Sequence, residues 1–218
     1  MIEQHLTINF QARYYQSAPI TPQTEKLLLV LHGYGQLARY FLKKFFVLDQ
    51  YRICVVAPEG LSRFYLEPVA SRAVTGNNRV GATWMTAEDR LTDIGNYLHY
   101  LDRVYQSVTA NQHHLAVTVL GFSQGAATAT RWVLHHPAIA QRLILWSGIF
   151  PNDMNFSEAR ERLADKQLVM VYGTNDPFIN DQRLQEMTQL TERLGITPPV
   201  ITFEGGHDIH PETLQQLI

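Results

Sequence analysis

Six runs of consecutive apolar residues indicate buried strands. A continuous run, unlike an alternating one, is typical of a parallel strand that is covered on both faces. The runs fall at residues 26–31, 52–57, 114–120, 142–146, 167–172 and 199–203. They predict a mostly parallel central sheet.

Segments with the period of an α-helix lie between these runs. The expected helices are at residues 37–48, from about residue 87, after residue 125, at 157–164, at 181–194 and from residue 211. Such regular alternation of strand and helix predicts an α/β fold with helices on both faces of the sheet.

Two parts of the chain depart from this alternation. Residues 2–10 and 12–16 alternate in part between apolar and polar positions, which predicts an opening pair of antiparallel strands with one face in water. Residues 58–87 show no clear period, and loops of that length usually serve function or are disordered. We expect this loop to shape a cleft.

The length and composition fit one domain over residues 1–218. A chain of 218 residues with 45% hydrophobic content can bury a sizeable core. The segment between residues 146 and 167 has room for one short helix, so no large cap domain is expected.

Charge and hydropathy exclude several kinds of partner. The net charge is −2 and no run of lysine and arginine could neutralise a row of phosphates, so we expect no nucleic acid partner. No window reaches the roughly 18 uninterrupted apolar residues of a membrane span, and the first residues lack the pattern of a secretion signal. We expect a cytoplasmic protein without stable membrane insertion. Because Cys54 is the one cysteine, no intrachain disulfide can form.

The segment Gly121-Phe122-Ser123-Gln124-Gly125 joins an expected strand to a helix-favouring stretch of small residues. In a GxSxG turn of this kind the backbone reverses sharply at the serine, and the residues two before and two after it must lack bulk. The turn lifts the Ser123 hydroxyl above the sheet and places the Gln124 amide at a helix N-terminus. Ser123 is therefore the candidate nucleophile.

A serine nucleophile needs a base, and the base needs an acid that fixes its tautomer. Asp176 follows the strand at 167–172, and His207 follows the strand at 199–203 after two glycines. Since the carboxyl ends of parallel strands meet at one edge of the sheet, these two side chains are expected beside Ser123. The order Ser, Asp, His along the chain is that of triads built on α/β sheets.

Other residues compete for these two roles. His210 is the second candidate for the base, but the glycines before His207 give that residue a freer backbone. Asp153 and Asp181 are the competing acids; Asp153 follows an earlier strand, and Asp181 has the character of a helix N-cap.

The turn after the strand at 26–31 supplies a candidate second donor for an oxyanion. It has the sequence His32-Gly33-Tyr34-Gly35, and its glycines let the backbone fold so that an amide points inward. The amides of Tyr34 and Gln124 would then form the oxyanion hole. We expect His32 to hold this loop by hydrogen bonds rather than to act as a base.

Neither a metal nor a cofactor is expected. The pairs His113-His114 and His135-His136 are adjacent, so their rings diverge on a strand or helix, and no CxxC or HExxH spacing occurs. The chain also lacks a GxGxxG after a strand and a GxxxxGK loop.

Seven motifs occur in the order that a known family shows. They are Leu31-His-Gly-Tyr-Gly35, Ala57-Pro-Glu-Gly60, Gly81-Ala-Thr-Trp-Met85, Gly121-Phe-Ser-Gln-Gly-Ala126, Trp146-Ser-Gly148, Tyr172-Gly-Thr-Asn-Asp-Pro177 and Gly206-His207. Together they resemble the phospholipase/carboxylesterase family of α/β-hydrolases, which includes acyl-protein thioesterases and small bacterial carboxylesterases.

The resemblance implies an α/β-hydrolase fold and a serine hydrolase that cleaves esters or thioesters. It places the catalytic residues on Ser123, Asp176 and His207 and the oxyanion amides on Tyr34 and Gln124. Two features depart from the family: many relatives carry an aliphatic residue in place of Tyr34, and residues 79–86 differ from the acyl-protein thioesterase branch. The second departure argues against protein depalmitoylation.

Aromatic and apolar residues near the expected cleft favour a small ester with an apolar acyl or aromatic group. Trp84 and Phe178 are the candidate substrate-binding residues. Two alternatives stay open: a lactone hydrolase or peptidase that uses the same three residues, and a module that binds an apolar ligand without catalysis.

Overall fold

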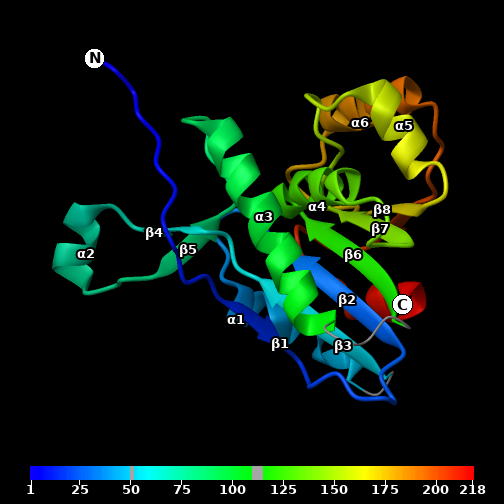
Figure 1. Ribbon diagram of the computed structural model, residues 1–218, viewed down its shortest axis with the longest axis horizontal. Coiled ribbons are helices and arrows are strands. Elements are labelled where there is room, and N and C mark those ends of the chain that lie inside the picture. The colour runs from blue at the N-terminus through cyan, green and yellow to red at the C-terminus, as the bar shows by residue number, and fades with distance from the viewer. Residues whose placement is uncertain (50–51, 110–114) are drawn as a thin grey trace.

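A seven-stranded sheet forms the centre of the molecule (Figure 1). The computed structural model describes residues 1–49, 52–109 and 115–218. In spatial order the strands are β1 (Tyr14–Gln16), β3 (Ile53–Pro58), β2 (Lys26–Leu31), β6 (Ala116–Phe122), β7 (Arg142–Trp146), β8 (Gln167–Gly173) and β9 (Val200–Phe203). Neighbours from β3 to β9 pair in parallel, and β1 pairs antiparallel with β3. The predicted mostly parallel sheet is confirmed.

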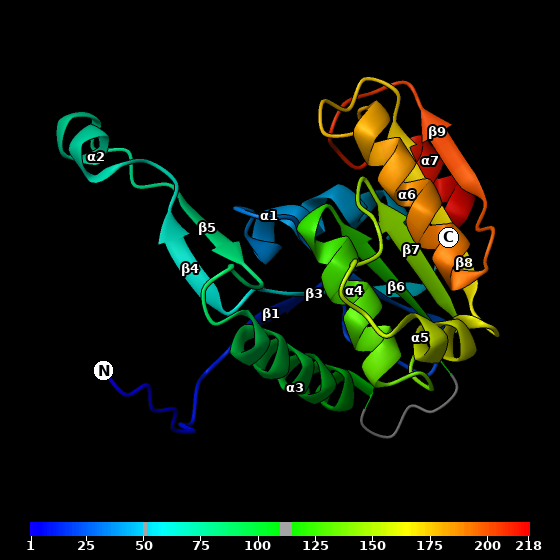
Figure 2. The same cartoon turned by 90° about the horizontal axis from the view of Figure 1, so that it is seen from above.

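Helices cover both faces of this sheet, as predicted (Figure 2). The helices are α1 (Ala38–Leu42), the 3₁₀ helix η1 (Lys43–Leu48), α2 (Val69–Thr75), α3 (Arg90–Thr109), α4 (Gln124–His135), α5 (Phe156–Leu163), α6 (Asp181–Leu194) and α7 (Pro211–Leu217). Side chains of α3, α4, α5 and α6 join one core, and those of α1, η1 and α7 join the other. Successive residues of a strand point to opposite faces, so Leu27 and Leu29 enter the first core and Leu28 the second.

The segment predicted as one helix at 37–48 changes type partway. It is α-helical to Leu42 and 3₁₀ from Lys43 onward. Leu42, Phe45 and Leu48 are all buried. A 3₁₀ helix has three residues per turn, so this spacing places all three side chains on one face.

The predicted strand at residues 2–10 is absent, and β1 is the only strand that forms within residues 1–16. The N-terminal segment runs away from the body without regular structure (Figure 1), and its apolar residues Leu6, Ile8 and Phe10 are exposed. An alternating pattern sets which side chains share a face, but a strand also needs a neighbour for its backbone groups. The strand partner expected at residues 2–10 is wrong for that reason, whereas the predicted antiparallel strand near the N-terminus is confirmed by β1, which pairs with β3.

Residues 58–87 form an arm rather than an irregular loop. β4 (Ser62–Tyr65) and β5 (Val80–Thr83) pair antiparallel and carry α2 between them, away from the main sheet (Figures 1 and 2). The root of the arm is bonded to the loop after β2: Gly35 N–H donates to Ala82 C=O at 2.9 Å, and Ala82 N–H donates to Gln36 C=O at 3.0 Å. A Cβ on Gly81 would lie 2.4 Å from the Gly35 oxygen, so the two segments can touch only through glycine.

Candidate active site

Ser123 lies at the junction of β6 and α4, in a strained backbone conformation. Its φ is 54° and its ψ −117°, a combination that non-glycine residues rarely adopt. The flanking glycines are required by contact: a Cβ on Gly121 would lie 2.3 Å from the Gly125 oxygen, and one on Gly125 would lie 2.1 Å from the Leu31 oxygen. The tight passage of α4 beside β6 and β2 thus holds the serine at the carboxyl end of the sheet.

Gln124 begins α4 and ties the turn to the arm. As the first helical residue it has an amide that cannot bond within the helix, and the helix dipole adds positive potential there. Its side chain accepts from Trp84 N–H at 3.2 Å, and its Nε2 donates to Met85 C=O and to Thr83 Oγ1, each at 3.0 Å. The side chain therefore fixes the end of β5 beside Ser123.

Asp176 and His207 are in direct contact. Asp176 is buried after β8; one carboxylate oxygen accepts from Phe178 N–H at 2.9 Å, and the other lies 2.7 Å from His207 Nδ1. An ionised carboxylate only accepts, so Nδ1 carries the proton and Nε2 is left as the basic atom. The two loops meet closely, since a Cβ on Gly173 would lie 2.2 Å from the Gly205 oxygen.

The His207 ring lies at the same site as the serine. It packs against Phe122, the residue before Ser123, with 4.7 Å between ring centroids. The His207 ring also packs against Phe178, with 4.6 Å between ring centroids, and Phe178 lines the same cleft as Ser123. The structure therefore brings Asp176 and His207 together and places Ser123 next to an aromatic ring that His207 touches.

His210, the alternative candidate for the base, is engaged in helix capping. His210 caps α7: its Nδ1 accepts from Thr213 N–H at 3.4 Å, and its ring stacks on Phe203 at 4.9 Å.

The alternative acids are also engaged elsewhere. Asp181 is the first residue of α6, while the N-cap is Asn180, whose side chain accepts from Arg183 N–H at 2.9 Å; the expected capping by Asp181 is wrong by one residue. Asp153 is bound by Arg90 and Arg131. Burial alone would raise the pKa of Asp153, but the bonds from the two arginines outweigh it and lower the pKa to about 2.

The turn that carries Tyr34 packs directly on Ser123. A Cβ on Gly33 would lie 3.1 Å from the Cβ of Ser123. Gln36 N–H donates to Gly33 C=O at 3.2 Å, a turn bond that does not use the Tyr34 amide. The Tyr34 ring points elsewhere: it is 61% exposed and packs on Phe64 of the arm.

His32 is a structural residue, in keeping with the expectation. It is fully buried, its Nε2 accepts from Gly60 N–H at 3.0 Å, and its Nδ1 lies 2.8 Å from Gly33 C=O. Burial lowers the pKa of His32, so the ring is neutral with its proton on Nδ1.

Trp84 packs against His32 and so supports the loop after β2. Only 2% of Trp84 is exposed, its indole N–H donates to His32 C=O at 2.8 Å, and its ring packs on His32 at 5.0 Å. A side chain buried in this way packs the core, so we assign it this role in place of the predicted contact with substrate.

A cleft of about 410 Å³ opens over Ser123. Phe178, 64% exposed, lines it as predicted for a substrate-binding residue, together with Met85 and Ile149. The other lining residues are Gln124, Ala127, Thr128, Arg131, Ser147, Gly148, Phe150, Pro151, Asn152, Arg183 and Glu186.

The sequence analysis did not predict two residues that line this cleft, Arg131 and Ser147. Arg131 lies three and four residues after Thr128 and Ala127, which share its helix face, so the helical period could have revealed it. Ser147 is the residue directly after β7, at the edge of the sheet where Ser123 lies.

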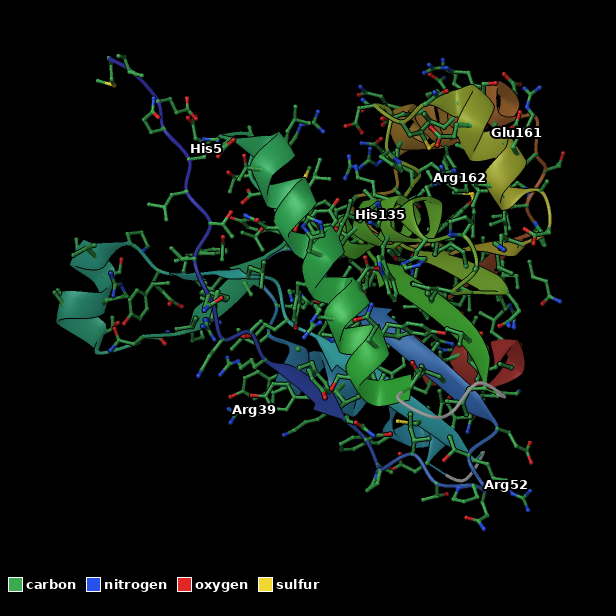
Figure 3. The ribbon with its side chains drawn as sticks, viewed as in Figure 1. His5, Arg39, Arg52, His135, Glu161 and Arg162 are labelled. Carbon is green, nitrogen blue, oxygen red and sulfur yellow. The ribbon has the colours of Figure 1, made fainter. Side chains whose placement is uncertain are left out.

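The histidine pairs do not form a metal site where the structure describes them. His135 is the last residue of α4 (Figure 3). His136 follows it, and the two rings are 6.2 Å apart and nearly perpendicular. Both face Asp102, with His136 Nδ1 3.0 Å from its carboxylate. His113 and His114 lie outside the described residues. One exposed group in the described ranges, Glu3, His5 and Asp89, could bring three metal-binding atoms together, but none of the three lines the cleft.

Comparison with known families now adds to this geometry. A family model described as serine hydrolase (FSH1) matches residues 21–217. The chain belongs to this serine hydrolase family. No curated protein sequence matches it.

Three solved structures illustrate the similarity of the fold. Acyl-protein thioesterase 2 of Zea mays has a TM-score of 0.66 at 18% identity, covering 95% of this chain and 96% of that one. Esterase PE8 has a TM-score of 0.67 at 20% identity, with 96% and 100% covered, and the Bacillus cereus carboxylesterase has 0.63 at 18%, with 96% and 92% covered. At such identities the likeness shows the fold, and the predicted α/β-hydrolase fold is confirmed. No helix in the described ranges is both long and apolar enough to span a bilayer.

Proposed function

We propose that the protein is a carboxylesterase-type serine hydrolase that cleaves small carboxylic esters or thioesters through an acyl-enzyme on Ser123. The observation that carries the proposal is the 2.7 Å contact between His207 Nδ1 and the buried Asp176 carboxylate, beside a serine with φ of 54°. A buried acid that fixes the tautomer of a histidine next to a strained, partly buried serine is the arrangement that nucleophilic acyl transfer needs.

In this mechanism His207 Nε2 accepts the Ser123 proton while the hydroxyl oxygen attacks the ester carbonyl. The amides of Tyr34 and Gln124 stabilise the tetrahedral oxyanion, and loss of one such donor costs about 3 kcal/mol. The imidazolium, stabilised by Asp176, returns the proton to the leaving alcohol or thiol as the carbonyl–oxygen or carbonyl–sulfur bond breaks. Water then attacks the acyl-enzyme, His207 accepts its proton, and Ser123 regains a proton as the carboxylic acid leaves.

The surroundings support a small substrate. Met85, Ile149 and Phe178 give the cleft apolar walls. Between β7 and β8 the structure forms α5 as its single regular element, so we infer one domain without a large cap. The cytoplasmic location stays a prediction.

A p-nitrophenyl ester series tests the proposal. We expect turnover of the acetate, butyrate or octanoate, loss of at least a thousandfold in kcat for Ser123→Ala, and covalent labelling of the unaltered protein by a fluorophosphonate probe. No turnover of any of these esters, or equal turnover by Ser123→Ala, would show that the proposal is wrong.

A further inference from the structure

Arg131 places a guanidinium in the wall of the cleft that contains Ser123. It lies on α4 eight residues after the serine, a rise of about 12 Å along the helix axis. Helical side chains tilt toward the N-terminal end, so a long side chain at this position reaches back toward the nucleophile. The side chain is 12% exposed and lines the cleft.

One edge of this guanidinium is engaged closely and the other only weakly. Nη2 donates to Asp153 at 2.7 Å. Among the described residues, Nη1 makes two long hydrogen bonds, to the Tyr97 hydroxyl at 3.5 Å and to the Met85 sulfur at 3.9 Å. Contacts of that length are weak, so a partly buried donor is left for a better acceptor.

Arg131 shares its carboxylate partner with a second arginine. Asp153 is shared by Arg90 and Arg131, so two cations face one carboxylate. The only carboxylate in the described lining of the cleft is Glu186, which is paired with Arg183 at 2.7 Å. Within the described residues, Arg131 therefore shares its ion-pair partner with a second cation, and the one carboxylate of the lining is already paired.

A second polar group in the same wall lacks a partner. The Ser147 hydroxyl is buried and has no hydrogen-bond partner in the described structure, and the residue has a strained φ of 50°. A buried hydroxyl without a partner is a site that a ligand oxygen can satisfy.

We propose that Arg131 binds a carboxylate on the substrate, so that the enzyme prefers half-esters or half-thioesters of dicarboxylic acids. This inference rests on the proposed serine hydrolase function. The substrate carboxylate receives a charge-assisted bond from Nη1, while the ester or thioester carbonyl of the same substrate lies at Ser123. Arg131 is thus a specificity-determining residue, and the reaction at Ser123 is unchanged by it.

The test compares two substrates that differ only at the far end of the acyl chain. These are the p-nitrophenyl half-ester of adipic acid and p-nitrophenyl hexanoate, in which a methyl group replaces the carboxylate. With uncatalysed hydrolysis subtracted, we expect the unaltered enzyme to show a kcat/KM at least tenfold higher for the adipate half-ester. A charge-assisted bond of this kind is worth roughly tenfold to a hundredfold.

Variants then assign the preference to one side chain. Arg131→Met should lower the adipate-to-hexanoate ratio of kcat/KM by tenfold or more, and Arg131→Lys should retain part of it. The matched control is Arg39→Met on α1 (Figure 3), outside the cleft lining, which should keep the ratio. Because removal of Arg131 alters the pairing of Asp153, the double variant Arg131→Met/Asp153→Asn repeats the measurement with both groups removed.

The outcomes separate this inference from the proposed function. Equal or better turnover of the hexanoate ester by the unaltered enzyme overturns the inference and leaves the proposed esterase function intact. This measurement uses only the unaltered enzyme, so it does not depend on the folding of any variant. An unchanged ratio in Arg131→Met overturns it as well. If neither ester is turned over, or Ser123→Ala matches the unaltered enzyme, the proposed function fails first.

Discussion

At the scale of single residues, burial decides which of the chemically capable side chains act and which support. His32 and His207 both follow strands, but His32 is enclosed with both ring nitrogens committed, whereas His207 commits only Nδ1. The sequence could single out Ser123, Asp176 and His207 as candidates because each follows a strand in a recognisable motif. It could not show that Trp84 is buried, since a tryptophan after β5 fits a cleft wall and a core equally well.

The burial of His32 predicts a pH-dependent stability. Because its pKa is lowered in the folded protein, the unfolded chain binds a proton at about pH 6.5 that the folded protein does not accept. The free energy of unfolding should therefore fall as the pH drops below about 6.5. For this one group the loss between pH 6.5 and 5 is up to about 2 kcal/mol.

Urea denaturation at several pH values, repeated with His32→Gln, measures this contribution. Glutamine can still accept from Gly60 N–H but does not titrate. The variant should lose less stability on acidification than the unaltered protein. Parallel curves for the two proteins would contradict the prediction.

At the scale of elements, the arm and the turn at Ser123 form one connected unit. The arm looked like an irregular loop in the sequence because its two strands are four residues each and their partner is another part of the same segment. The N-terminal segment shows the converse, since a strand-like pattern forms no strand without a neighbour. Pairing, unlike periodicity, is not contained in either stretch alone. The sequence therefore revealed neither the two strands of the arm nor the lack of a strand at residues 2–10.

Thr83 tests whether this connection matters for catalysis. Its hydroxyl bonds to the Gln124 side chain at 3.0 Å and to Met85 C=O at 2.8 Å. Thr83→Val keeps the shape but removes these bonds. We expect a loss of about 1–3 kcal/mol in stability and a severalfold drop in kcat for p-nitrophenyl butyrate.

The control is Thr130→Val on α4, whose hydroxyl bonds back to Ala126 C=O of its own helix at 2.9 Å. This variant should stay within twofold of the unaltered kcat. If the two valine variants behave alike, the bond to Gln124 has no effect on the reaction.

At the scale of the whole molecule, the sheet separates two cores that do not share side chains. Val55 and Val56 are neighbours on β3, yet Val55 packs with α1, η1 and α7, and Val56 packs in the core under α3 and α4. This division could be predicted, because continuous apolar strands between helical segments require a cover on each face. The 3₁₀ geometry of η1 and the length of each loop depend on how side chains pack in space. The sequence alone could not predict them.

Substitutions at these two valines should therefore be additive. Val55→Ala and Val56→Ala each remove a buried group at about 1% exposure or less, at a cost of about 2 kcal/mol. In the double variant the two costs should sum to within about 0.5 kcal/mol, although the residues are adjacent. Urea unfolding of the three variants measures this, and a larger coupling energy would mean that the cores communicate through the strand.

The contact between Gly81 and Gly35 has a consequence for how homologous chains can vary in length. Residues inserted at the tip of the arm, around α2, would extend into solvent and leave the Tyr34 amide where it is. One residue added at the root would shift Ala82 against Gln36 and carry the Tyr34 amide, the proposed oxyanion donor, out of line with Ser123. Differences in length within the arm should therefore be confined to its tip, around α2.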